Sequence, residues 1–181
     1  MLSSNSQTLN VRALAETAIA AALCMALSFI PTQIGWFEIS LGMIVLTIFS
    51  LRRGLVLGLS AGLIWGLLHF ILGKVYFLSV PQVLIEYVLA FTAGGIAGVF
   101  KPWVKSTSVG LIVVSAFAAS IFRYFFHFIA GVIFWSDYAW KGWGAVAYSL
   151  VINGTSGLLT AIVSAIIAVF VIKAYPKILN P

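Results

Sequence analysis

The chain has 181 residues, of which 62% are hydrophobic and only 8% are charged, and its mean hydropathy is +1.15. Soluble domains carry roughly 25% charged residues, so this composition excludes an ordinary soluble protein and predicts an all-α integral membrane protein. The net charge of +6 does not indicate binding to nucleic acid, because the basic residues stand singly or as one pair between apolar runs.

The first part of the sequence contains four apolar runs that predict transmembrane helices, at residues 11–30, 39–51, 54–72 and 81–100. A span needs roughly 20 residues, so the run at 39–51 is short, and the loop before it, which carries Trp36, is predicted to dip into the protein. In the third run a glycine recurs at every fourth position, which favours tight packing against another helix. These glycines are Gly54, Gly58, Gly62 and Gly66.

Ala18 and Ala22 lie four residues apart in the first run and form a flat face of small side chains. Such a face allows the backbone of another helix to approach closely. The residues alone leave two alternatives, packing within this protein and docking of a partner subunit, and they favour internal packing.

Two further runs, at residues 109–135 and 145–172, complete six predicted transmembrane helices. The loop between them is rich in tryptophan and tyrosine, as is typical of a membrane–water interface. With six spans both termini lie on one side of the membrane, and the positive-inside rule places them in the cytoplasm. The residues on that side are Arg12, Arg52, Arg53, Lys101, Lys105, Lys173 and Lys177, against Lys74 and Lys141 on the other side.

Polar residues of three spans are predicted to converge at one depth near the extracellular side. A helix rises by about 1.5 Å per residue, which puts Glu86, His127 and Asn153 at similar distances from the outer ends of their helices. An ionisable residue within a span indicates a functional site. A carboxylate among aromatic rings favours an organic cation, because ring faces and the carboxylate both attract positive charge. We therefore expect a flat, cationic, ring-containing ligand.

Other interpretations of the same residues remain open. His127 could bond a neighbouring helix, and Arg123 could form a structural ion pair with Glu86. An intramembrane enzyme could use His127 and Glu86 as acid and base, although the sequence shows no nucleophile for it. Phosphate-binding loops and metal-ligand motifs are absent from the sequence, so no cofactor or metal is expected. Uphill transport would then draw on an ion gradient or on another subunit.

Four sequence blocks give the chain a likeness to a known family. They are SLRRG at residues 50–54, LIEYV at 84–88, FFHFIAGVIFW at 125–135 and YAWKGWGAVAYSLVING at 138–154. Across nearly its whole length the chain resembles the thiamine-specific S components of energy-coupling factor (ECF) transporters, the substrate-capture subunits of bacterial vitamin uptake systems.

This resemblance implies a single domain over residues 1–181 with the six-helix ECF S-component fold, embedded in the bacterial cell membrane. It implies high-affinity capture of thiamine from outside, and association with a membrane scaffold subunit and two ATPases. It also reverses the preference for internal packing, because in such families the alanine face, here Ala18 and Ala22, docks on the scaffold.

The resemblance assigns ligand contacts residue by residue. The aromatic rings would stack on the ligand, Glu86 would face its charged or polar end, and His127 and Asn153 would form hydrogen bonds. Two positions depart from the family pattern, since Lys74 stands where histidine is expected and Arg123 where lysine is expected. An S component for another vitamin or a thiamine precursor is the alternative. The assigned contacts are Trp36, Glu38, Trp65, Tyr76, Glu86, Tyr87, His127, Trp135, Tyr148 and Asn153.

Overall fold

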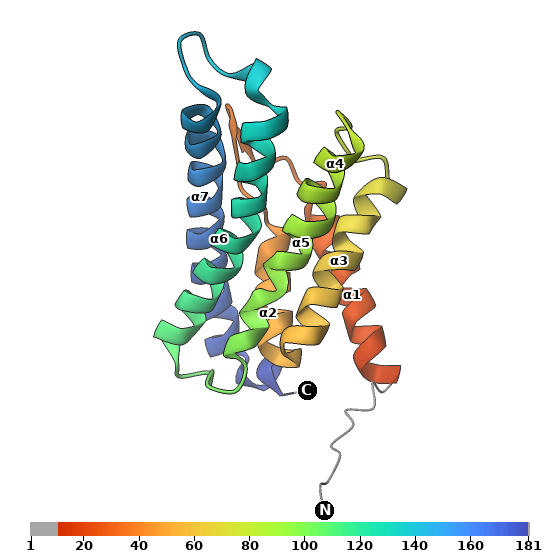
Figure 1. The fold of residues 1–181 in the computed structure, drawn as a ribbon. Coiled ribbons are helices and arrows are strands. Elements are labelled where there is room, and N and C mark those ends of the chain that lie inside the picture. The colour runs from red at the N-terminus through yellow and green to blue at the C-terminus, as the bar shows by residue number, and fades with distance from the viewer. Residues whose placement is uncertain (1–10, 181) are drawn as a thin grey trace, which may run out of the picture.

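A computed structural model describes residues 11–180; residues 1–10 and 181, which the predicted domain includes, lie outside the described part. Six helical segments form an elongated bundle (Figure 1). Three of them, Val80–Phe100, Val109–Phe134 and Ala145–Ala174, are long and apolar enough to cross a membrane. The predicted all-α, six-helix membrane architecture is confirmed. The segments are α1 (Val11–Leu27), α2 (Gly42–Arg53), α3 (Leu55–Ile71), the continuous stretch α4–η1–α5–η2 (Val80–Phe100), α6 (Val109–Phe134) and α7 (Ala145–Ala174).

The segment before α2 differs from the sequence prediction. It forms a hairpin of β1 (Gln33–Ile34) and β2 (Phe37–Glu38), which turns at Gly35 with a φ of +63°. At the end of β2 and just after it, the backbone N–H groups of Glu38 and Ser40 donate to side-chain hydroxyls of α7, at 3.2 and 3.0 Å. These bonds hold residues 38–40 in a non-helical course, so α2 begins at residue 42 and not at 39.

The span at residues 80–100 is helical throughout but not regular. The short α4 (Val80–Val83) leads into a π-helical turn, η1 (Leu84–Leu89), which contains Glu86 and Tyr87. After α5 (Ala90–Ala93) the chain narrows to a 3₁₀ helix, η2 (Gly94–Phe100). π-Helical turns often occur at functional sites, because they change the direction of the side chains that they carry.

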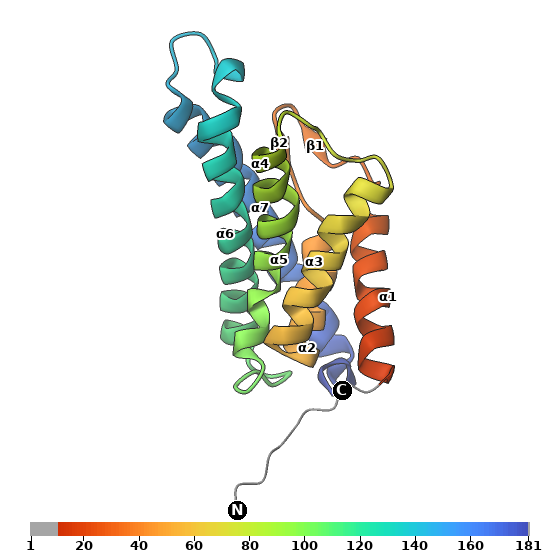
Figure 2. The ribbon, with the colours of Figure 1, turned by 45° about the vertical axis from the view of Figure 1, so that its right-hand side comes forward.

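The glycine stripe of α3 packs directly against this span (Figure 2). A Cβ atom added at Gly62 would meet the carbonyl group of Phe91, and one added at Gly66 would meet the carbonyl oxygen of Tyr87. Gly58 lies in the same way against Gly95 of η2. We call this contact of Gly58, Gly62 and Gly66 the glycine seam. It confirms the predicted tight packing and identifies the partner helix.

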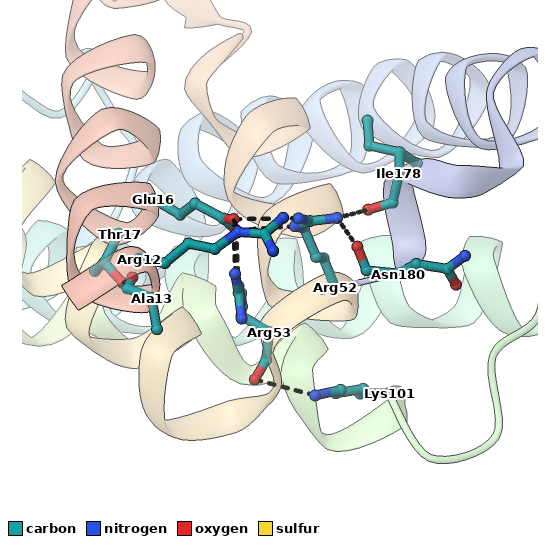
Figure 3. Close-up of polar contacts among 9 residues, drawn as sticks. All are labelled: Arg12, Ala13, Glu16, Thr17, Arg52, Arg53, Lys101, Ile178 and Asn180. Carbon is teal, nitrogen blue, oxygen red and sulfur yellow. Dashed lines mark hydrogen bonds and ion pairs between the residues drawn. The ribbon is translucent and has the colours of Figure 1, made fainter. Parts of the chain in front are cut away.

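At the opposite end of the bundle from the hairpin, Glu16 of α1 binds several arginines (Figure 3). It accepts hydrogen bonds from Arg52 at 2.9 Å and Arg53 at 2.7 Å, both at the end of α2, and from Arg12 at 3.1 Å. Arg52 also donates to the carbonyl oxygen of Ile178, in the terminal turn η4 (Pro176–Leu179), at 3.0 Å. One carboxylate thus connects α1 to α2, and Arg52 connects α2 to the end of the described chain.

Most of the basic residues lie at this same end. The start of α1, the turn between α2 and α3, the loop of residues 101–108 and the C-terminal turn are all found there (Figure 1). Lys74 lies in the loop that follows α3, and Lys141 lies in the aromatic loop between α6 and α7 (residues 135–144). Both loops are at the other end of the bundle, where the hairpin is (Figure 2). The distribution agrees with termini on the cytoplasmic side.

The glycine seam gives a direct prediction for stability. Gly66→Ala adds a methyl group against the Tyr87 carbonyl, so the two helices must separate, and we expect a loss of about 1–3 kcal/mol of unfolding free energy. Gly154→Ala in α7 is the control, because a Cβ there meets only Leu150 at 3.9 Å. Thermal unfolding in detergent would show a lower midpoint for Gly66→Ala alone. Equal midpoints for the two variants would contradict the seam.

Candidate functional site

Two neighbouring cavities lie at the hairpin end of the bundle. The first, which we call the hairpin cavity, has a volume of about 430 Å³, and the second, the belt cavity, about 270 Å³. Consecutive residues of the π-helical turn separate them, since Tyr87 lines the first and Glu86 the second. Charged and aromatic residues and histidines of the hairpin cavity include Glu38, His69, Lys74, Tyr87, Phe91, Arg123 and His127. Those of the belt cavity are Trp36, Glu86, Trp135, Tyr138, Tyr148, Ser149 and Asn153.

Glu86 is the buried carboxylate of the belt cavity, with 8% of its surface exposed. It accepts a hydrogen bond from the indole N–H of Trp135 at 2.7 Å and another from the Gln82 amide. Neither donor carries a charge, and no Lys, Arg or His within residues 11–180 lies at ion-pair distance from Glu86. Its negative charge is therefore available to a cation in the cavity.

Gln82 fixes the loop above Glu86 as well as Glu86 itself. Its amide N–H donates to the carbonyl oxygen of Tyr76 at 3.1 Å, and its amide oxygen accepts from the backbone N–H of Leu78 at 3.0 Å. The side chain is completely buried. The sequence analysis missed this residue, although its spacing of four from Glu86 on a helix was a usable signal.

Aromatic side chains form a wall beside Glu86. The ring of Trp135 lies 4.9 Å from that of Tyr76 and 5.2 Å from that of Tyr138, centre to centre. The two tyrosine hydroxyls are 3.1 Å apart, and this hydrogen bond raises the pKa of Tyr138, which stays protonated at neutral pH. The Tyr87 hydroxyl accepts from the backbone N–H of Tyr76 at 2.9 Å, which ties the wall to the π-helical turn.

Asn153 and Ser149 form the polar floor of the belt cavity. Asn153 donates to the Ser149 hydroxyl at 3.1 Å, and that hydroxyl donates to the Phe128 carbonyl at 2.8 Å. The chain of bonds orients the amide and leaves its carbonyl oxygen for a ligand. Gly131 of α6 makes the arrangement possible, since a Cβ there would collide with the Ser149 hydroxyl.

The hairpin cavity contains two histidines that differ in their hydrogen bonds. His69 is 2.9 Å from the Trp65 carbonyl through Nδ1, which must carry the proton because a carbonyl only accepts. His127 contacts the rings of Phe91 and Tyr124, and its ring nitrogens have no hydrogen-bond partner among the described residues. His127 can therefore bond a ligand without breaking an existing contact.

Arg123 lies at the base of the hairpin cavity and is only 5% exposed. Its guanidinium carbon is 4.3 Å from the centre of the Phe91 ring and 4.9 Å from that of Trp65. No carboxylate of the described chain is within ion-pair distance of it, so the proposed structural pair with Glu86 is wrong. The two side chains line different cavities.

The structure brings most of the predicted site residues to these two cavities. Three line the hairpin cavity, Glu38, Tyr87 and His127, and five line the belt cavity, Trp36, Glu86, Trp135, Tyr148 and Asn153. Tyr76 stands in the wall beside Trp135, whereas Trp65 is completely buried behind the hairpin cavity and lines neither. Their contacts with a ligand remain predictions.

Taken together, the two cavities offer groups that can bind a ligand. They present a buried carboxylate, aromatic faces and hydrogen-bonding groups, which suit an aromatic cation. Within residues 11–180, no group of three or more His, Cys, Asp or Glu side chains is placed to hold a metal.

Comparisons with known proteins agree in the family that they indicate. The family model described as thiamine transporter protein matches residues 14–180. Thiamine transporter ThiT of Lacticaseibacillus paracasei is 37% identical, covering 90% of this chain and 88% of its own, and ThiT of Bacillus subtilis is 32% identical, covering 79% of each. A solved structure of ThiT from Listeria monocytogenes superimposes with a TM-score of 0.91 at 44% identity, covering 94% of this chain and 98% of the other.

Trp65 supports the site from behind, and its replacement should affect stability. Its indole N–H donates to the Ser28 hydroxyl at 3.0 Å, and its ring packs on Gly42. Trp65→Phe loses this bond and leaves a void, so we expect the unfolding free energy to fall by about 1–3 kcal/mol, as measured by thermal unfolding. The control Trp143→Phe, at a residue 45% exposed, should change stability by less than about 0.5 kcal/mol. A harmless Trp65→Phe would contradict the supporting role.

Proposed function

This chain belongs to the thiamine transporter protein family, and from that premise we propose that it captures thiamine at the outer side of the membrane for an ECF-type transporter. Proteins of this family are transporters in the membrane and not enzymes. The interpretation of His127 and Glu86 as an acid and base pair is therefore rejected. The sequence has ligand-binding groups but no phosphate-binding loop for ATP. We therefore propose that this chain binds the ligand and that other subunits hydrolyse ATP.

Glu86 carries the proposal for the ligand. Its buried carboxylate has two neutral donors and no cationic partner among the described side chains. Thiamine combines a cationic thiazolium ring with an aminopyrimidine ring, so a carboxylate beside aromatic faces matches both its charge and its N–H donors. We propose that Glu86 and Asn153 bind the aminopyrimidine ring and that Trp135 stacks on it.

The hairpin cavity would receive the other half of the ligand. Tyr87 lies one residue after Glu86, and we propose that a ligand of two joined rings extends past the π-helical turn from one cavity to the other. His127, with its free ring nitrogens, and Glu38 of β2 are the polar groups available to the thiazolium ring and its hydroxyethyl arm. The remaining assigned contacts, with Trp36, Trp65, Tyr76 and Tyr148, belong to the same proposal.

The alanine face of α1 supports the proposed partners. Ala18 and Ala22 are exposed, and so is the neighbouring Ile19, at 59%. An exposed small-residue stripe on a membrane helix is suited to close approach by a second helix. We propose that the ECF scaffold subunit docks here and that two ATPase subunits supply the energy.

A titration of the purified chain with thiamine tests the ligand. Six tryptophans are present in the sequence, and Trp135 lines the belt cavity, so bound thiamine should quench their fluorescence with saturation. An aminopyrimidine precursor without the thiazolium ring, titrated in parallel, tests the alternative ligand. Absence of a saturable response to thiamine at micromolar concentration would reject the proposal.

Glu86→Gln keeps the shape of the side chain and removes its charge. We expect thiamine affinity to fall by about 2 kcal/mol or more, roughly 30-fold in Kd, because a charge-assisted hydrogen bond to a buried carboxylate is lost. Asp137→Asn is the matched control, since Asp137 is exposed in the aromatic loop and lines neither cavity. The same titration measures both variants. An unchanged Kd for Glu86→Gln would make Glu86 a structural residue.

Ala22→Leu tests the docking face without touching either cavity. A leucine side chain would hold an approaching helix away, so we expect at least a tenfold loss in co-purification with the scaffold and ATPase subunits. Thiamine binding should be retained. Gly154→Leu on the exposed surface of α7 is the control for an added bulky side chain. Equal complex formation by both variants would move the docking site away from α1.

A further inference from the structure

An apolar groove lies between α6 and α7 at the cytoplasmic end of the bundle, and we call it the α6–α7 groove. Its volume is about 610 Å³. Val113 and Phe117 of α6 form one wall, and Ile166 and Phe170 of α7, which are 63% and 72% exposed, form the other. Both helices are long and apolar enough to cross the membrane, so the groove opens toward lipid chains. No residue of this groove lines the hairpin cavity or the belt cavity.

Lys173, in the last turn of α7, is the charged side chain of the groove. No carboxylate of residues 11–180 lies within ion-pair distance of it. The four acidic side chains of the sequence lie elsewhere, since Glu16 binds the arginines of α2 and Glu38, Glu86 and Asp137 lie at the hairpin end. The positive charge of Lys173 is therefore available to an anion from outside the described chain.

The start of α6 adds positive potential at the same end of the groove. Val109, the first residue of α6, lines the groove together with Lys173. The side chain of Ser108 makes no capping hydrogen bond to α6, and its hydroxyl accepts instead from the backbone N–H of the exposed Lys105 at 3.1 Å. The first N–H groups of a helix carry partial positive charge, which favours a nearby phosphate.

The length of the groove matches one leaflet of a bilayer. From Ile162 to Lys173, which both line it, α7 rises by about 16 Å, and half of a hydrocarbon core is about 15 Å. A second apolar hollow, which extends from Phe117 toward Leu150, contains no basic side chain. A lipid headgroup therefore finds its cationic partner only at the cytoplasmic end of the described α6–α7 surface.

We propose that the α6–α7 groove binds an anionic phospholipid of the cytoplasmic leaflet. The lipid phosphate accepts hydrogen bonds from Lys173, and one acyl chain lies along Phe117 and Ile166. Basic pockets between membrane helices on the cytoplasmic side suit the headgroups of such lipids. The groove and α1 lie on opposite sides of the bundle, so the lipid leaves the face proposed for the scaffold subunit open (Figure 1).

A second copy of this chain is a poorer occupant of the groove. In a two-fold dimer through this face the same patch of both copies would meet, which brings the two Lys173 side chains toward each other. Like charges brought together in an interface cost free energy, and the groove has no carboxylate to offset them. A lipid phosphate removes that cost.

Native mass spectrometry of the full chain in detergent tests the headgroup site, with phosphatidylglycerol as the anionic probe and phosphatidylcholine as the zwitterionic one. We expect the wild type to bind phosphatidylglycerol about fivefold more tightly than phosphatidylcholine. Lys173→Gln should remove most of this preference. Lys177→Gln is the matched control and should keep it, because Lys177 is an exposed lysine at the same end that does not line the groove.

Two neighbouring substitutions in α6 test the acyl-chain part of the groove. Val113→Trp fills the groove and should weaken the binding of both lipids by about fivefold, because the acyl chain loses its apolar contact. Val114→Trp is the control, at a residue that is 50% exposed and does not line the groove. Should Val113→Trp fail to fold, as judged by thermal unfolding, Ile166→Trp in the opposite wall takes its place.

Four results would overturn the proposal. They are equal affinity of the wild type for the two lipids, equal loss of preference in Lys173→Gln and Lys177→Gln, equal weakening by Val113→Trp and Val114→Trp, and a wild-type dimer that Val113→Trp dissociates. The last would make the groove an interface between copies. Thiamine titration of the same variants should give the wild-type Kd, so the lipid site and the proposed capture of thiamine can each fail without the other.

Discussion

The close contact at the glycine seam is the constraint on which the site depends. Gly62 and Gly66 let the backbone of α3 touch the carbonyl groups of Phe91 and Tyr87, a distance that no larger residue allows. The seam thereby fixes the π-helical turn, which directs Glu86 into one cavity and Tyr87 into the other. A bilayer supplies little hydrophobic force between helices, so such backbone packing holds the polar residues in place.

Two buried side chains of opposite charge, Glu86 and Arg123, lie in different cavities around this turn and do not pair with each other. Among the described residues, Glu86 receives hydrogen bonds from neutral donors only, and Arg123 is covered by aromatic rings with no carboxylate at ion-pair distance. Separate buried charges of opposite sign cost free energy, which pairing would have reduced. For Glu86, we propose that a bound ligand supplies the missing partner.

At the cytoplasmic end the charges are paired. Glu16 joins α1 to α2 through Arg52 and Arg53, and Arg52 holds the carbonyl of Ile178 (Figure 3). This network orients α1 at its base while leaving the face of Ala18 and Ala22 exposed. A helix fixed at one end and open along one side is a suitable platform for the proposed scaffold subunit. The two ends of the bundle therefore differ in their charges, which are paired with one another at the cytoplasmic end and are proposed to bind a ligand at the other.

The sequence by itself determined the membrane class, the six helices, their orientation and the tendency of α3 to pack tightly, because composition, helical period and loop charge are local properties. It also singled out Glu86, since a carboxylate in an apolar run is conspicuous. Only the tertiary structure decided two other features. One is the hairpin, whose Glu38 backbone N–H donates to the Ser156 hydroxyl, 118 residues further along the chain. The other is the division of the site into two cavities. The tertiary structure also decided that Arg123 has no carboxylate partner within residues 11–180. These features depend on which remote segments meet, and hydrogen-bond partners across helices leave no periodic pattern in the chain.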